Sequence, residues 1–65
     1  ENDAAQTIDQ TLQAIKGLQS GQKYVDLQPA PASVRRLQHE VARQAHLVSE
    51  SFGKDPNRFV RIFRD

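Results

Sequence analysis

Residues 47–64, LVSESFGKDPNRFVRIFR, decide the fold, because they predict two strands joined by a turn. The segments 47–52 and 58–64 are both rich in the β-branched and aromatic residues that favour strands. The five residues between them, Gly53-Lys54-Asp55-Pro56-Asn57, are dense in turn formers. We therefore expect an antiparallel hairpin in this part of the chain.

The second of these strands alternates between two kinds of side chain. Val60 and Ile62 fall on one face, and Phe59, Arg61 and Phe63 fall on the other. If Val60 and Ile62 pack beneath the helices, the other three lie on an open sheet face, where aromatic rings can stack on unpaired bases. The opposite arrangement, with the phenylalanines in the core or against the rest of a longer protein, is equally compatible with the pattern.

Working upstream, the sequence predicts a helix that begins near Pro31 or Ala32 and runs to about Ala45, since proline suits the first turn of a helix. On a wheel at about 100° per residue, one side of this helix is apolar. That side consists of Val34, Leu37, Val41 and Ala45.

A short strand is expected at 23–27, with Val25 and Leu27 on one face. Before it, residues 4–19 predict a first helix, which Asp3 and Gln6 begin as a capping box and Ser20-Gly21 ends. The expected core-facing side chains of this helix are Ala5, Ile8, Leu12 and Ile15.

The order helix, strand, helix, strand, strand predicts an α+β fold in which two helices pack on one face of a small three-stranded antiparallel sheet. With 65 residues the chain is expected to form one domain, 1–65, and its start at Glu1 suggests a module excised from a longer protein. Its hydrophobic content is 37% without Cys, so no disulfide supplements the core.

Charge is distributed unevenly along the chain. Residues 1–32 carry a formal charge of −2 and residues 33–65 carry +3, mostly from arginine, which favours phosphate or carboxylate partners. The apolar runs are far shorter than the roughly 20 residues that cross a bilayer, so no membrane partner is expected. We expect the protein in the cytoplasm or in a plastid or other organellar matrix.

The second helix combines its apolar side with a basic one. Arg35, His39 and His46 cluster about 120° from the apolar stripe and are expected to face solvent, with Arg36 and Arg43 beside them. Arg35 and His39 are i,i+4 neighbours able to hold one phosphate or base together, and Arg35 has no carboxylate three or four residues away. An external anion is thus its natural partner, although an ordinary solvated helix face would show the same pattern.

The segment Arg35-Arg36-Leu37-Gln38-His39 contains the Arg-x-x-x-His signature of the R-3-H domain, and this part of the chain resembles that module, which binds single-stranded nucleic acid. The resemblance extends over about Tyr24 to Ile62, through Ser49-Glu50-Ser51, Gly53 and Pro56-Asn57-Arg58 with the apolar strand that follows. It implies a small fold with a three-stranded sheet and helices on one side. It also implies that Arg35, His39 and Arg58 contribute to binding single-stranded DNA or RNA.

Many members of this family carry a second arginine after Pro-Asn-Arg, where this chain has Phe59, so stacking is expected to replace one phosphate contact. The segment 53–63 is most similar to versions attached to bacterial, cyanobacterial or plastid ATPases, and a Jag-like protein is the other expected parent. The expected interface comprises Arg35, His39, Arg36, Arg43, Arg58, Lys54, Arg61 and Phe59.

Two roles remain open for His39: contact with the nucleic acid, or fixing the helix on the sheet. No enzyme, cofactor, metal or small-molecule substrate is expected, because there is no Cys, the two His lie about 10 Å apart on one helix, and no carboxylate pair flanks them. Ser49 and Ser51 are expected to be ordinary polar strand residues. The rival function is a protein-interaction module that docks an acidic partner or other domains of its parent protein.

Overall fold

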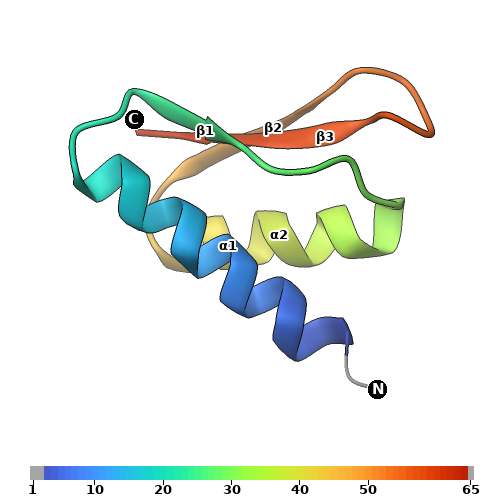
Figure 1. Cartoon of the computed structure of the whole chain (residues 1–65), viewed down its shortest axis with the longest axis horizontal. Helices are drawn as coiled ribbons and strands as arrows, with labels where there is room; N and C mark the ends of the chain where they lie inside the picture. Colours follow the sequence, from blue (N-terminus) through green and yellow to red (C-terminus); the bar gives the residue numbers. More distant parts are fainter. Residues whose placement is uncertain (1–2, 65) are drawn as a thin grey trace.

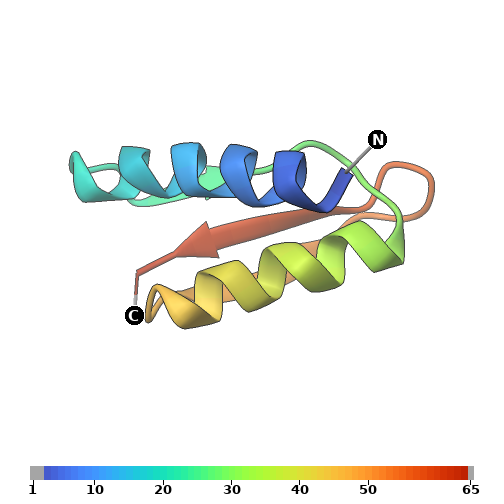
Figure 2. The same ribbon diagram turned by 90° about the horizontal axis from the view of Figure 1, so that it is seen from below.

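The computed structural model describes residues 3–64, with side chains from residue 4 onward, and it confirms the predicted order of elements. These are α1 (Asp3–Gln19), β1 (Tyr24–Asp26), α2 (Ala32–Gln44), β2 (Val48–Phe52) and β3 (Phe59–Phe63). The strands pair antiparallel in the order β1-β3-β2, so β3 is central. Both helices lie on one face of this sheet (Figures 1 and 2), as the α+β prediction requires.

The alternation along β3 divides the molecule into a covered and an open side. Val60 and Ile62 are fully buried and join Ile15, Leu18 and Ala42 of the helices in the core. The side chains between them, Phe59, Arg61 and Phe63, therefore lie on the sheet face that carries no helix among the described residues. The first of the two arrangements compatible with the sequence is confirmed.

The buried face of α1 differs from the predicted one. Thr7, Thr11, Ile15 and Leu18 are buried, whereas the predicted core residues Ala5, Ile8 and Leu12 are exposed. Threonine is tolerated in this core because the Thr11 hydroxyl donates a hydrogen bond to the Thr7 carbonyl oxygen (2.7 Å) within the helix. The expected capping box cannot be placed, since the side chain of Asp3 lies outside the described residues.

The second helix is also rotated from its predicted orientation. Its buried residues are Gln38 and Ala42, whereas the predicted apolar stripe of Val34, Leu37, Val41 and Ala45 is only half-buried. The difference is about 75° around the helix axis. It arises because α2 contacts α1 on one side and β2 and β3 on another, so its apolar stripe and its core-facing side do not coincide.

The turns that connect the elements contain the glycine and proline residues predicted from the sequence, and one turn also contains a residue in the left-handed conformation that was not predicted. Gly21 ends the first helix with a positive φ of 111°, and Pro31 precedes the first residue of α2. His46 takes a left-handed φ of 63°, and the Leu47 amide donates to the Ala42 carbonyl (3.0 Å). This compact turn brings β2 back directly beside α2.

Alanine substitutions at two leucines of α1, one buried and one exposed, test which face of this helix is buried. Leu18 is 1% exposed and Leu12 is 45% exposed. We expect Leu18→Ala to lower the free energy of unfolding by about 3 kcal/mol, through lost apolar burial and a cavity. Leu12→Ala should cost less than about 1 kcal/mol. Urea denaturation followed by circular dichroism measures both, and equal losses would contradict the orientation of α1.

Candidate nucleic-acid interface

His39 joins α2 to the edge strand β2. Its Nδ1 atom is hydrogen-bonded to Ser49 Oγ (2.5 Å), and its Nε2 atom is hydrogen-bonded to Ser51 Oγ (2.9 Å). Because side chains alternate along a strand, Ser49 and Ser51 both point to the covered face of the sheet, toward α2. The imidazole therefore faces the sheet, which corrects the outward position expected from the helical wheel and agrees with the second of the two roles left open for His39, fixing the helix on the sheet.

The surroundings of this imidazole disfavour its charged form. Burial lowers the pKa of His39 below its ordinary value, and the positive charge of Arg35 lowers that pKa further. The serine hydroxyls can accept or donate, so both ring nitrogens keep partners in either protonation state. The penalty for protonation is thus desolvation and repulsion, with no loss of hydrogen bonds.

Arg35 is also held within the protein, whereas the sequence predicted an external anion as its natural partner. Its side chain is 12% exposed, and Nη1 donates to the Ala30 carbonyl oxygen (2.5 Å). The same nitrogen lies 3.4 Å from Asp55 Oδ1, a carboxylate 20 residues away in sequence. Arg35 thereby connects the segment before α2 to the turn between β2 and β3.

That turn is shaped by internal hydrogen bonds. Gly53 has a positive φ of 90°, and Arg58 Nη1 donates to its carbonyl oxygen (2.8 Å). The Asn57 amide donates to the carbonyl of Lys54 (2.7 Å), and the Asp55-Pro56 peptide bond is cis. The Lys54 side chain is exposed and has no ion pair within the described residues.

The solvent side of α2 carries the remaining predicted arginines. Arg36 and Arg43 border a shallow groove of about 330 Å³ whose other lining residues include His39 and Ser49. Arg43 forms an exposed ion pair with Glu40, which together with a hydrogen bond from Gln44 lowers the pKa of the Glu40 carboxyl. In the part of the chain that the structure describes, Arg36 makes no ion pair.

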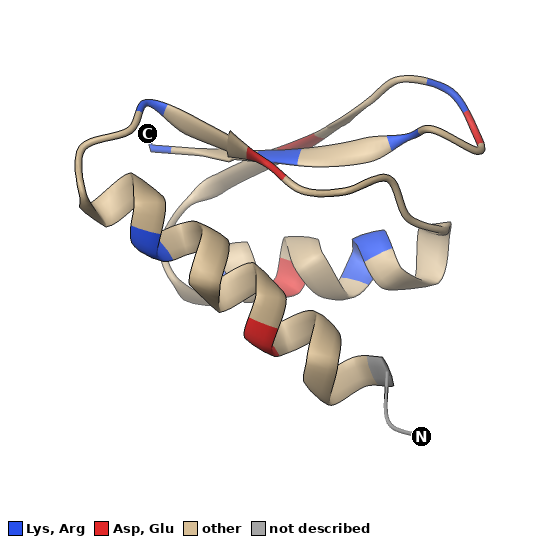
Figure 3. Cartoon of the chain, in the orientation of Figure 1, with Lys and Arg blue, Asp and Glu red and all other residues tan. Residues whose placement is uncertain are grey.

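These elements gather positive charge at one end of the molecule. The first turns of α2 and the turn between β2 and β3 approach each other there (Figure 3), carrying Arg35, Arg36, Lys54 and Arg58. Asp55 is the acidic residue among them, and its side chain is 78% exposed. Arg43 lies two turns further along α2 and extends the basic surface past the groove.

The last two predicted residues, Phe59 and Arg61, lie on the open face of the sheet, apart from the groove. Arg61 is not free, because Nε lies 2.6 Å from Asp26 Oδ1 and Nη2 lies 3.1 Å from Asp26 Oδ2. The eight predicted site residues therefore form two surfaces that meet at Arg58 and Phe59, where β3 begins.

Sequence reasoning missed several partners of these residues. Ser49 and Ser51 were expected to be ordinary polar residues, yet they determine where His39 lies. Their spacing of two within a strand, opposite a histidine on the adjacent helix, was the available signal. The contact of Asp55 with Arg35 left no such signal, because a partner 20 residues away follows no local periodicity.

The environment of His39 predicts a pH dependence of stability. Its pKa is lower in the folded protein than the value near 6.5 expected after unfolding, so protons bind preferentially to the unfolded chain. We expect the melting temperature to fall as pH decreases from about 7.5 to about 5.5, and to level off below the folded pKa. His39→Gln should lower stability at the higher pH and reduce this slope. His46→Asn, at an exposed position whose left-handed φ asparagine tolerates, is the matched control, and a slope unchanged by His39→Gln would refute the assignment.

Comparison with known protein families identifies the family of this chain. The family model of the R-3-H domain matches residues 5–64, and no curated protein matches the chain. The match covers α1 as well as the signature helix and the hairpin, and domains of this family generally bind nucleic acid and are not catalytic. The chain therefore belongs to the R-3-H domain family of nucleic-acid-binding domains.

Proposed function

We propose that the domain binds single-stranded nucleic acid, DNA or RNA, along the solvent side of α2 and the turn between β2 and β3. The observation that carries this proposal is the cluster of Arg36, Lys54 and Arg58 at one end of the molecule, none of which has a carboxylate partner in the described chain. Unpaired cations in proximity attract a polyanion and release its condensed counterions.

The arginines and lysine contribute unequally in this proposal. Arg36, Lys54 and Arg58 contact phosphates directly, since their charges are not compensated. Arg43 contacts a phosphate at the far end of the groove, at the cost of its exposed pair with Glu40. Exposed pairs of this kind are weak, so the exchange costs little.

Arg35 and His39 act in this proposal as positioning residues beside the nucleic acid. The guanidinium of Arg35 already has the Ala30 carbonyl and Asp55 as partners, and both nitrogens of His39 are occupied by serine hydroxyls. Together they fix the rotation of α2 and the position of the turn. Arg36 and Lys54 then face solvent from two elements that are held against each other.

The preference for single-stranded over double-stranded nucleic acid follows from the aromatic ring that adjoins the basic turn. Phe59 comes directly after Arg58 and lies on the open face of the sheet, within reach of a chain whose phosphates lie at the turn. An aromatic ring stacks on a base only when that base is unpaired and free to splay out. A duplex satisfies the cations equally well but offers no base to Phe59.

Fluorescence anisotropy with labelled oligonucleotides tests the proposal. A single strand should bind more tightly than a duplex of the same length, and heparin should compete poorly at matched charge. If about four phosphates are neutralised, the slope of log K against log salt should be near −3. Arg36→Ala should make this slope about 0.7 less negative and weaken binding several-fold, with unchanged circular dichroism.

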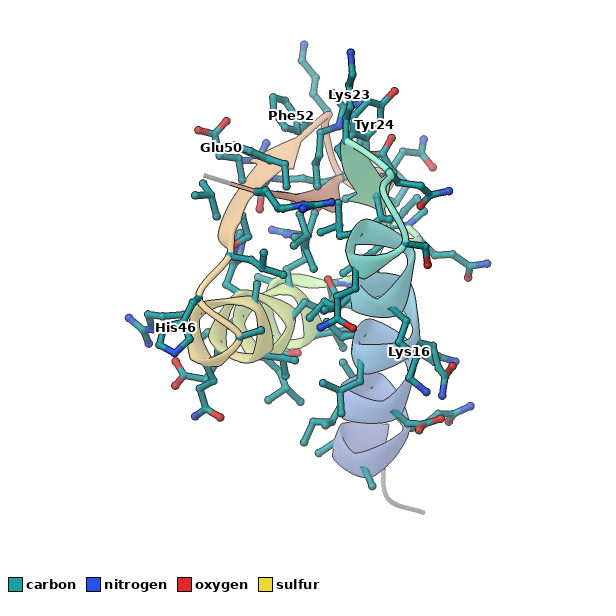
Figure 4. All side chains as sticks on the ribbon, turned by 90° about the vertical axis from the view of Figure 1, so that its left-hand side faces the viewer. Lys16, Lys23, Tyr24, His46, Glu50 and Phe52 are labelled. Atoms are coloured by element: carbon teal, nitrogen blue, oxygen red, sulfur yellow. The ribbon has the colours of Figure 1, made fainter. Side chains whose placement is uncertain are left out.

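Lys16→Ala is the matched control, because it removes one exposed charge from α1 on another side of the molecule (Figure 4). This variant should leave the affinity and the salt slope nearly unchanged, apart from the small effect of lowering the net charge of the domain by one. A folded domain that binds neither DNA nor RNA at low salt would refute the proposal, and would favour docking to an acidic protein surface.

A further inference from the structure

Every aromatic side chain of the protein lies on the open face of the sheet. The chain has one tyrosine, three phenylalanines and no tryptophan. The antiparallel register pairs Tyr24 with Phe63 and Phe52 with Phe59 on this face, while the buried core of the described residues is built from other side chains, mainly aliphatic ones and threonine. Large rings usually supply the core of a small domain, so an uncovered aromatic face calls for a ligand.

A single guanidinium organises these rings. The Cζ atom of Arg61 lies 4.4 Å from the ring centroid of Tyr24, 5.1 Å from that of Phe52 and 6.0 Å from that of Phe59. Asp26 holds the same guanidinium through two nitrogens, at 2.6 Å and 3.1 Å. Arg61 is thus a fixed planar surface between rings, with its charge compensated by a neighbour on β1.

The rings keep surface free on either side of Arg61. Tyr24 is 50% exposed and Phe52 is 38% exposed, and Figure 4 shows both projecting from the sheet on the side away from the helices. The Phe52 and Phe59 rings lie 6.1 Å apart in a tilted pair. Two separate aromatic surfaces, one at Tyr24 and one at Phe52 with Phe59, therefore flank the guanidinium.

Charge on this face favours bases over phosphates. The charge of Arg61 is compensated by Asp26, and Glu50, which faces Arg61 across the β2–β3 register, adds a negative charge. Positive charge lies instead at the two ends of the face. Lys23 precedes Tyr24 in sequence, and Lys54 and Arg58 flank the Phe52–Phe59 pair. A single nucleic-acid strand with its phosphates at those ends would present its bases to the rings between them.

We propose that the open sheet face is a base-stacking platform on which Tyr24 and Phe52 each hold one unpaired base, one on either side of Arg61. This inference rests on the proposed binding of single-stranded nucleic acid, and it assigns the specificity for unpaired bases to residues outside the Arg-x-x-x-His helix. We assign nucleic acid as the ligand of this face because the Phe52–Phe59 pair directly adjoins the basic turn that carries Lys54 and Arg58, where the proposed function places the phosphates. A nucleic-acid strand bound at the turn reaches the Phe52–Phe59 pair directly, and from there it passes Arg61, whose charge Asp26 compensates, before it reaches Tyr24.

The test compares two ligands with the same phosphates: a single-stranded DNA oligonucleotide, and an abasic oligonucleotide of equal length. Tyr24 is the sole tyrosine, so its ring proton resonances report directly on the platform. The Tyr24 ring proton resonances should shift upfield when the base-containing strand binds, because a stacked base adds its ring current. The abasic strand should leave these resonances unshifted. Tyr24→Leu and Phe52→Leu should each weaken binding of the base-containing strand about tenfold and leave abasic binding unchanged.

Two further variants separate this inference from the function on which it rests. Arg36→Ala should weaken binding of both ligands, and Leu12→Ala, which shortens an exposed apolar side chain on α1, should weaken neither. If Arg36→Ala reduces binding of both ligands while the Tyr24 resonances do not shift and the leucine variants bind the base-containing strand like the wild type, the platform is refuted and the proposed function stands. If the folded protein binds neither of these ligands, nor a single-stranded RNA of the same length, both are refuted together.

Discussion

The arrangement of this domain depends on two serine hydroxyls that point from β2 into the protein. Ser49 and Ser51 are half-buried on the covered face of β2, and a hydroxyl withdrawn from water without a hydrogen-bond partner costs up to about 1–3 kcal/mol. His39 supplies both partners from a single ring. In doing so it sets the rotation of α2, which places Gln38 and Ala42 in the core and leaves Arg36 facing solvent.

This constraint gives Arg35 and His39, the two ends of the signature segment, a different role from Arg36. Arg35 and His39 bond to the protein itself, and each reaches an element distant in sequence: the hairpin turn for Arg35 and β2 for His39. Arg36 has no such ion-pair partner among the described residues. A surface whose supporting side chains are already fixed loses little conformational freedom on binding, so more of the interaction energy contributes to affinity.

Local signals in the sequence predicted the elements well. The turn formers at 53–57, the prolines before α2 and the alternation of Val60 and Ile62 each act within a few residues, and each prediction is confirmed. The helix orientations were predicted less well, because a helical wheel assumes one core direction and α2 has neighbours on two sides.

The contacts within the candidate site were the least predictable feature. The partners of Arg35 and Arg61, Asp55 and Asp26, are 20 and 35 residues away, so only the strand register and the packing of the hairpin bring them together. The signature residues were correctly placed on α2, but their neighbours depend on that packing. Alternation placed Phe59 and Arg61 together on one face of the sheet, and the burial of Val60 and Ile62 in the structure shows that this face is the open one.

The central strand also has consequences for how such a domain can change over generations. Its buried residues and its open-face residues alternate along one short segment, so the two sets point to opposite sides of the sheet and pack against different neighbours. A lineage, or a protein engineer, can therefore exchange the rings of the outer face while Val60 and Ile62 continue to maintain the fold. Under the proposed stacking function, stability and ligand preference depend on alternate residues of a single five-residue strand.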